Sequence, residues 1–196
     1  GVIFIQKQPL SQISIKLLAQ LLSVVLTYQP HASELTALDV VKMGRIPYRS
    51  TFSLLQSNDF DLIDKALHLT HSTNLALRKL NTLSDGERQR IFIAKALAQD
   101  TPIILLDEPT AFLDFANKVS TMQLLRQLAH TEGKTILLST HDVELALHFA
   151  DNLWMLNTDG ITEGEPHTLA HDGEISHFFC TEGIRFDAMQ MRFYYK

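Results

Sequence analysis

Three short apolar runs constrain the fold of this chain more than any other feature of its sequence. They cover residues 103–106, 135–139 and 153–156. None of them alternates between apolar and polar residues, and such runs are typical of strands buried on both faces of a sheet. Strands of this kind occur in parallel sheets whose faces are covered by helices. The runs therefore predict the sheet of an α/β domain.

Helical patterns lie between these runs. One apolar stripe comprises Val119, Met122, Leu125 and Leu128, and a second pattern covers residues 143–149 after the start signal Asp142. Two earlier strand signals lie at residues 2–5 and 23–26. Strands that alternate with helices predict a parallel sheet with crossover helices.

The middle of the chain has a different pattern. Residues 36–43 (TALDVVKM) and 61–69 (DLIDKALHL) are both helical in pattern, with the loop GRIPYRS between them. In the second stretch Leu62, Ile63, Ala66 and Leu67 fall on one face. We expect residues 1–196 to form a single domain. Within it, a helical subdomain is expected at about 36–100, and small strands and turns at about 160–196.

Composition excludes several classes of protein. The chain has 196 residues, is 45% hydrophobic and carries a net charge of −5, with no basic stripe of the kind that binds nucleic acid. A single cysteine, Cys180, excludes an internal disulfide and a cysteine-based zinc site. No apolar run approaches the roughly 20 residues that cross a bilayer. Because the sequence opens at Gly1 with a strand pattern, we expect it to begin within a domain.

Two acids follow the apolar run at residues 103–106. Asp107 and Glu108 could simply be surface acids at the end of a buried strand. The functional alternative is a site at the carboxyl end of a parallel strand, where α/β folds place their ligands. There Asp107 could hold Mg²⁺, a cation that prefers oxygen ligands. Glu108 could orient and deprotonate an attacking water.

A histidine follows the next apolar run. His141 lies 34 positions beyond Asp107 and two residues after the strand pattern at residues 135–139. A single histidine at a strand end is most often structural. If it shares a sheet edge with Glu108, its imidazole could instead hydrogen-bond a terminal phosphate and the attacking water.

The stretch LSDGERQ, residues 83–89, has two compatible interpretations. Ser84 and Glu87 match the S-x-x-E capping box of a helix that runs on through Ile91, Ala94, Leu97 and Ala98. A helix N-terminus with a serine and a glycine is also a ready phosphate site. Asp114, in the sequence AFLD, is the expected N-cap of the following helix.

The order of these motifs carries a resemblance. The stretch LSDGERQRIFIAKALAQDTPIILLDEPTAFLD, followed by KTILLSTHD, resembles the ATP-binding subunit of ABC transporters from the signature motif to the H-loop. The GRIPY element is similar to the corresponding element in ATPases of importers for iron complexes, siderophores, haem and cobalamin. The resemblance implies a P-loop NTPase-type α/β core, a parallel sheet with an inserted helical subdomain, of which the N-terminal part is missing here. It also implies that the protein is an ATPase.

The resemblance assigns a role to each motif residue. Asp107 would serve Mg²⁺, Glu108 would be the general base, His141 the switch histidine and Asp114 the D-loop aspartate. The signature would comprise Leu83, Ser84, Asp85, Gly86 and Glu87, with Ser84 and Gly86 meeting the γ-phosphate of ATP. Asp85 and Glu87 depart from the usual LSGGQ, which we interpret as tuning. In the Q-loop, Thr27 takes the place where glutamine is expected, and Gln29 lies two positions on.

A Walker A motif is absent from residues 1–196. The sequence Gly133, Lys134, Thr135 lacks the required glycine five positions earlier, where Leu128 stands. It also precedes a strand, whereas a P-loop precedes a helix. We expect the missing strand, P-loop and helix, on the order of 30 residues, to lie before Gly1.

The sequence therefore predicts a subunit that binds and hydrolyses ATP with Mg²⁺ to power import of an iron complex or cobalamin, and that is inactive at this length alone. Its expected partners are a second ABC ATPase domain, a transmembrane permease and, indirectly, a substrate-binding protein, with no nucleic acid. We expect it at the cytoplasmic face of the membrane, as a peripheral subunit. The alternatives are a non-transport ABC ATPase and a catalytically dead remnant.

Overall fold

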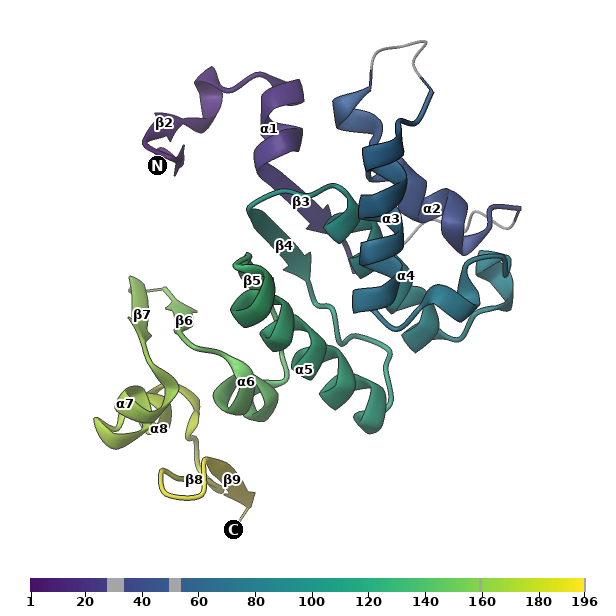
Figure 1. Ribbon diagram of the computed structural model, residues 1–196. Helices are drawn as coiled ribbons and strands as arrows, with labels where there is room; N and C mark the ends of the chain where they lie inside the picture. The colour runs from purple at the N-terminus through teal and green to yellow at the C-terminus, as the bar shows by residue number, and fades with distance from the viewer. Residues whose placement is uncertain (28–33, 50–53, 159, 196) are drawn as a thin grey trace. The chain divides into compact units, whose positions relative to one another are not determined.

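The computed structural model describes residues 1–27, 34–49, 54–158 and 160–195, which form two compact units, Gly1–Ser139 and Thr140–Lys196 (Figure 1). Each unit has its own apolar core. We therefore describe each one by itself.

A three-stranded parallel sheet lies at the centre of the first unit. Its strands are β3 (Leu22–Val25), β4 (Ile103–Asp107) and β5 (Thr135–Ser139), in that order across the sheet (Figure 1). The register pairs Val25 with Leu106 and Asp107 with Ser139, so the carboxyl ends of the strands meet at one edge. The predicted parallel sheet is confirmed.

Burial differs from the expectation for the outer strands. The central strand β4 buries Ile104 and Leu106, whereas Leu137 on β5 and Val24 on β3 are 43% and 46% exposed. The prediction that residues 135–139 are buried on both faces was wrong. In the part of the chain that the structure describes, β5 pairs with β4 only, and edge positions have fewer neighbours to cover them.

The start of the chain forms small elements. Strands β1 (Phe4–Ile5) and β2 (Gln8–Pro9) pair antiparallel, and the 3₁₀ turn η1 (Leu10–Gln12) leads into α1 (Ile15–Leu21). The strand signal at residues 2–5 is thus confirmed only in its last two residues. Its antiparallel partner follows after a two-residue turn at Gln6 and Lys7, both with positive φ.

Helices α2 (Ala37–Met43), α3 (Ser57–Leu69) and α4 (Asp85–Ala98) form the middle of the first unit, and α4 contacts both others and β3 (Figure 1). The 3₁₀ turns η2 (Ile46–Tyr48), η3 (Thr73–Leu75) and η4 (Leu80–Thr82) connect them. Helix α4 buries Ile91, Ala94, Leu97 and Ala98 as predicted, and also Phe92, Ile93 and Ala96. It is therefore the central helix of this core.

Helix α5 (Phe115–Glu132) precedes β5 and adds Leu124, Leu125 and Leu128 to the same core. It ends at Gly133, whose φ of +61° places it in the left-handed region that favours glycine. Thr135 then opens β5. The GKT sequence is thus a helix end followed by a strand, which confirms that it is not a P-loop.

The second unit begins with α6 (Val143–Phe149) and the hairpin of β6 (Leu153–Asn157) and β7 (Gly160–Gly164). Two short helices follow, α7 (Pro166–His171) and α8 (Glu174–Phe179), and then the hairpin of β8 (Ile184–Asp187) and β9 (Arg192–Tyr195). Its core lies around Leu147, Met155 and Ile175.

Two expectations for this unit need correction. Residues 153–156 were predicted to lie in the parallel sheet and to be buried, but β6 pairs antiparallel with β7 and Trp154 is 54% exposed. The Asn157 side chain accepts a hydrogen bond from the Gly160 N–H at 2.8 Å, and this contact closes the hairpin. The tail after Gly160 also contains α7 and α8, beyond the strands and turns expected there.

Candidate active site

The carboxyl edge of the parallel sheet brings together the ends of β4 and β5 and the segment that follows β3. The carboxylate of Asp107, at the end of β4, accepts a hydrogen bond at each oxygen. Thr27 Oγ1 donates to Oδ2 at 2.6 Å, and Ser139 Oγ donates to Oδ1 at 2.9 Å. Thr27 follows β3 by two residues and Ser139 is the last residue of β5. Asp107 is therefore held from both neighbouring strands.

These hydroxyl groups also set the charge of Asp107. The hydrogen bond from Thr27, and then that from Ser139, hold the pKa of the Asp107 carboxyl below its usual range, because both stabilise the ionised form. Asp107 is exposed at the sheet edge. It is thus a carboxylate at neutral pH, open to a ligand.

The residues at this edge fit a magnesium ion. Mg²⁺ is usually bound by one or two protein carboxylates, with water and substrate phosphates completing its oxygen ligands. Asp107 supplies one carboxylate between two hydroxyl groups. Among the described residues, no three His, Cys, Asp or Glu side chains gather into a complete metal cage. Such a donor set suits an ion that is shared with a phosphate ligand.

Glu108 follows in an unusual backbone conformation. Its φ is +45°, a value in the left-handed region that residues other than glycine adopt rarely. Its N–H lies 3.2 Å from the carbonyl oxygen of Ser139 and 3.1 Å from Ser139 Oγ. With this positive φ, the chain leaves the extended conformation of β4 directly after Asp107. Strained backbone of this kind is often found at functional sites.

The stretch Leu83–Glu87 begins helix α4. Ser84 is the N-cap: its Oγ accepts from the Glu87 N–H at 3.3 Å, and the Glu87 carboxylate accepts from the Ser84 N–H at 2.8 Å. The predicted capping box is confirmed. Leu83 is buried and anchors the turn before the cap.

The two acidic departures in this stretch are both neutralised locally. Arg78 Nη1 lies 3.1 Å from Glu87 Oε1, and Arg88 Nη2 lies 3.5 Å from Asp85 Oδ1. The Ser84 N–H, and then the charge of Arg78, hold the pKa of Glu87 below its usual range. The Glu87 carboxylate is thus hydrogen-bonded to the Ser84 N–H and paired with Arg78. Sequence reasoning missed Arg78, because nothing in its spacing links it to Glu87.

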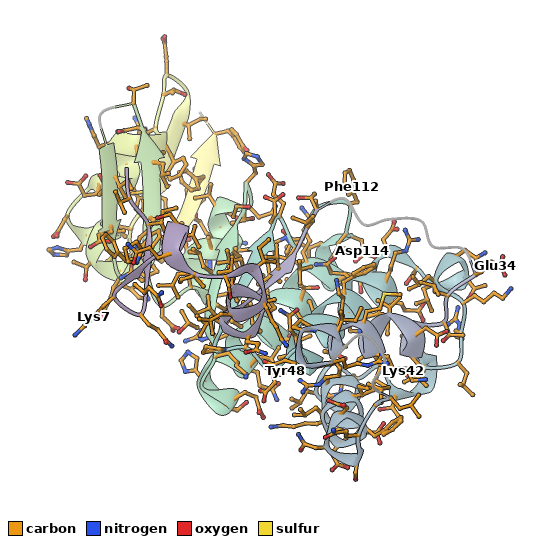
Figure 2. All side chains as sticks on the ribbon, turned by 90° about the horizontal axis from the view of Figure 1, so that it is seen from above. Lys7, Glu34, Lys42, Tyr48, Phe112 and Asp114 are labelled. Carbon is orange, nitrogen blue, oxygen red and sulfur yellow. The ribbon has the colours of Figure 1, made fainter. Side chains whose placement is uncertain are left out.

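Asp114 caps helix α5, as predicted. Its carboxylate accepts from the Asn117 N–H at 2.8 Å and from Asn117 Nδ2 at 2.9 Å. It closes the loop after Glu108, in which Phe112 has a φ of +62° and is 83% exposed. Figure 2 labels Phe112 and Asp114 on this loop. Asn117 also packs against Gly86, because a Cβ added to Gly86 would lie 2.8 Å from Asn117 Oδ1.

Two of the predicted site residues cannot be placed against these groups. His141 belongs to the second unit, two residues after Ser139 along the chain, so its position relative to Glu108 stays a prediction. Gln29 lies outside the described residues. Of the two Q-loop candidates, Thr27 is therefore the one whose contact with Asp107 is described.

Comparison with known proteins supports the resemblance. The family model described as "ABC transporter" matches residues 1–111, which is more than half of the chain. The chain belongs to the ABC transporter family. By family it is therefore an ABC-type ATPase domain. No helix among the described residues has the length and apolar character needed to cross a membrane.

Named relatives include ATP-binding proteins of petrobactin import and of achromobactin transport. The petrobactin import ATP-binding protein FpuD of Bacillus anthracis is 36% identical over 93% of this chain and 67% of its own length. The achromobactin transport ATP-binding protein CbrD of Dickeya dadantii is 37% identical over 79% of this chain and 58% of its own length. The chain thus spans about three fifths to two thirds of these relatives.

Solved ABC structures share the fold. A structure described as an inward-facing metal-chelate type ABC transporter matches with a TM-score of 0.75 and 32% identity, over 82% of this chain and 64% of that one. The dimeric bacterial ABC transporter cassette MJ0796 matches with a TM-score of 0.67 and 28% identity, over 85% of this chain and 73% of that one.

Proposed function

We propose that the chain is part of an ATP-binding and ATP-hydrolysing subunit that powers import of an iron complex, such as a siderophore or haem, or of cobalamin. The observation that carries the proposal is the arrangement at the sheet edge. There Asp107 is held by Thr27 and Ser139, and Glu108 follows directly on a turned backbone. The import and transport names of the relatives, and the metal-chelate type of the similar solved transporter, favour this substrate class.

Each residue at the edge has a role in this proposal. Asp107 would hold a magnesium ion, which would supply charge neutralisation on the phosphates. Glu108 orients the attacking water and accepts its proton. His141, whose position relative to Glu108 stays a prediction, is proposed to hydrogen-bond the terminal phosphate. Positioning and charge stabilisation of this kind account for most of the catalysis of phosphoryl transfer.

The stretch Leu83–Glu87 serves a second nucleotide site in this proposal. With Gly86 and the capping Ser84, the start of α4 offers the N–H groups and positive dipole that favour a phosphate. Head-to-tail pairing of two cassettes sets this stretch against the ATP bound by the other cassette, with Asp114 at the junction. The dimeric solved cassette is consistent with such pairing.

The remaining partners follow from the import role. The subunit works with a transmembrane permease, reached at the cytoplasmic face of the membrane, and indirectly with a substrate-binding protein. It needs no nucleic acid, in keeping with its net charge of −5.

The test is ATP hydrolysis by the subunit assembled with its permease. Glu108→Gln is expected to lower Mg²⁺-dependent phosphate release by about 100-fold or more, because a general base contributes roughly 10²–10⁴ in rate. Glu163→Gln, the same change at an exposed position on β7, is the matched control and should leave the rate unchanged. Full activity of Glu108→Gln would contradict the proposal.

Uptake measurements test the substrate class. Cells that depend on this subunit should take up labelled ferric siderophore, haem or cobalamin, and the Glu108→Gln variant should abolish that uptake. Normal uptake of all three by the variant would refute the import role, even if the protein hydrolyses ATP.

A protein of residues 1–196 alone should show no steady-state ATP turnover. These residues contain no G-x-x-x-x-G-K-[ST] sequence, so they lack the lysine and the backbone cradle that hold phosphates. Phosphate release by purified residues 1–196 is the measurement. A turnover that Glu108→Gln abolishes would disprove this expectation.

A further inference from the structure

Ser139 forms hydrogen bonds with both Asp107 and Glu108. It is the last residue of β5 and is paired with Asp107 in the register of the parallel sheet. Because side chains alternate along a strand, Ser139 lies on the same face of β5 as Thr135 and Leu137. No role was assigned to it from the sequence, since a serine at the end of an apolar run is unremarkable.

Its single hydroxyl group contacts both acids. The hydroxyl donates its proton to Asp107 Oδ1 at 2.9 Å and accepts from the Glu108 N–H at 3.1 Å. A serine hydroxyl has one hydrogen to donate and can accept in addition, so both interactions can exist together. One oxygen atom thus links the side chain of the first acid to the backbone of the second.

Each of the two Ser139 contacts restrains one of the acids: the Asp107 carboxylate or the Glu108 backbone. The bond to Oδ1, together with that from Thr27 to Oδ2, restricts rotation of the Asp107 carboxylate. A carboxylate has about four lone-pair sites, so each oxygen keeps capacity for a further ligand. The bond to the Glu108 N–H supports the left-handed backbone from which the Glu108 side chain projects.

We propose that Ser139 is a positioning residue that sets the orientation of Asp107 and Glu108 relative to each other for ATP hydrolysis. This inference rests on the proposed function, and it adds the residue that joins the two acids. Ser139 acts through its neighbours, in the way that outer groups orient metal ligands in other proteins.

The test compares three variants of the subunit assembled with its permease. Ser139→Ala removes the hydroxyl, Ser139→Thr keeps a hydroxyl on a β-branched side chain suited to a strand, and Thr135→Ala is the matched control on the same face of β5. Measured are kcat, KM for ATP and the Mg²⁺ concentration that gives half of the maximal rate.

Ser139→Ala is expected to lower kcat and raise the half-saturating Mg²⁺ concentration, each by about 10-fold or more, since outer groups typically contribute 10- to 100-fold. The KM for ATP should change little. Ser139→Thr should recover most of the loss, and Thr135→Ala should behave as the unchanged protein. Equal kcat and Mg²⁺ dependence for Ser139→Ala and the unchanged protein would overturn the inference.

A second readout needs neither metal nor nucleotide. Hydrogen exchange of the Glu108 amide in the metal-free protein should become about fivefold faster in Ser139→Ala, because one of its two acceptors is lost. Ser139→Thr and Thr135→Ala should leave that rate unchanged. An unchanged rate in Ser139→Ala would show that the hydroxyl does not hold Glu108.

The two readouts separate the inference from the proposed function. If the unchanged complex hydrolyses no ATP, the proposed function fails whatever the exchange rates show. If it hydrolyses ATP and Ser139→Ala matches it in every measurement, only the role of Ser139 fails.

Discussion

Gly86 and Asn117 join the first turns of helices α4 and α5. Gly86 is buried in the first turn of α4, where a Cβ would lie 2.8 Å from Asn117 Oδ1 and 2.9 Å from Asn117 Cγ. Asn117 cannot easily withdraw, because Asp114 holds both its N–H and its side-chain amide. The stretch Leu83–Glu87 and Asp114 are therefore linked within one chain through Asn117.

A double substitution tests this link. Gly86→Ala should lower the free energy of unfolding, because overpacking costs about 1–3 kcal/mol, against a gain in helix propensity of about 1 kcal/mol. In a background of Asn117→Ala the same change should cost nothing or stabilise, since the clashing amide is gone. Urea unfolding of the four proteins measures the coupling. Additive effects would contradict the contact.

Local chemistry was predictable at the residue scale, and distant partners were not. The caps at Ser84 and Asp114 depend on residues three positions away, so their patterns are visible in the sequence. Thr27 and Ser139 reach Asp107 across 80 and 32 positions, through the register of the sheet. Such contacts require the fold before they can be inferred.

At the scale of elements, a buried ion pair connects the loop after α2 with helix α3 in the helical middle of the chain. Arg45 Nε donates to Asp59 Oδ1 at 2.8 Å, and Arg45 Nη1 donates to the carbonyl oxygen of Ala98, the last residue of α4, at 2.8 Å. The guanidinium also lies 4.2 Å from the ring centroid of Tyr48. One arginine thus ties η2 to α3 and α4.

Arg45→Met should destabilise the first unit by about 3–5 kcal/mol, because removing one partner leaves a buried charge unpaired. The side chains of Arg45 and Asp59 are only 5% and 11% exposed. Lys65→Met is the matched control: Lys65 is 56% exposed in its pair with Glu132, and such a pair contributes about 1 kcal/mol or less. Thermal unfolding measures both. Equal effects would refute the role of the buried pair.

The same pair predicts a dependence on pH. The Gln56 N–H holds the pKa of Asp59 below its usual range, burial opposes this, and Arg45 adds to the lowering. A lowered pKa in the folded state gives stability above the ordinary aspartate value of about 3.9, and this stability is lost as pH falls through the lowered pKa. Asp59→Asn should therefore flatten the loss of stability in acid below about pH 4. If the free energy of unfolding of Asp59→Asn fell below pH 4 as steeply as that of the unchanged protein, this prediction would be contradicted.

Element types were predictable where a pattern is long or capped. The helical patterns at 36–43 and 61–69 and the apolar run at 103–106 correspond to α2, α3 and β4. Helix α3 begins at Ser57, four residues before the predicted start. The pairing of β6 was not predictable from its apolar run, because periodicity does not specify a partner strand. Helices α7 and α8 have six residues each, too short for a helical period to stand out.

At the scale of the molecule, the chain combines two acids at a sheet edge with the capped helix α4. The order of the motifs carried the family and the fold, because spacing along the chain reflects crossover connections in the sheet. The central claim is the division of labour that we propose for these motifs: Asp107 and Glu108 serve one nucleotide, while Leu83–Glu87 serves the nucleotide of a second cassette.

Phosphate release by a mixed pair tests this claim most directly, with residues 1–196 combined with an intact cassette subunit of the same importer. Ser84→Arg in the 1–196 chain blocks the approach of a phosphate. Ser84→Asp keeps a good N-cap for α4 but places a carboxylate toward the phosphate. Both variants should lower hydrolysis by the mixed pair by about 10-fold or more, in line with the loss of a phosphate-stabilising contact. Hydrolysis unchanged by both variants would contradict the account.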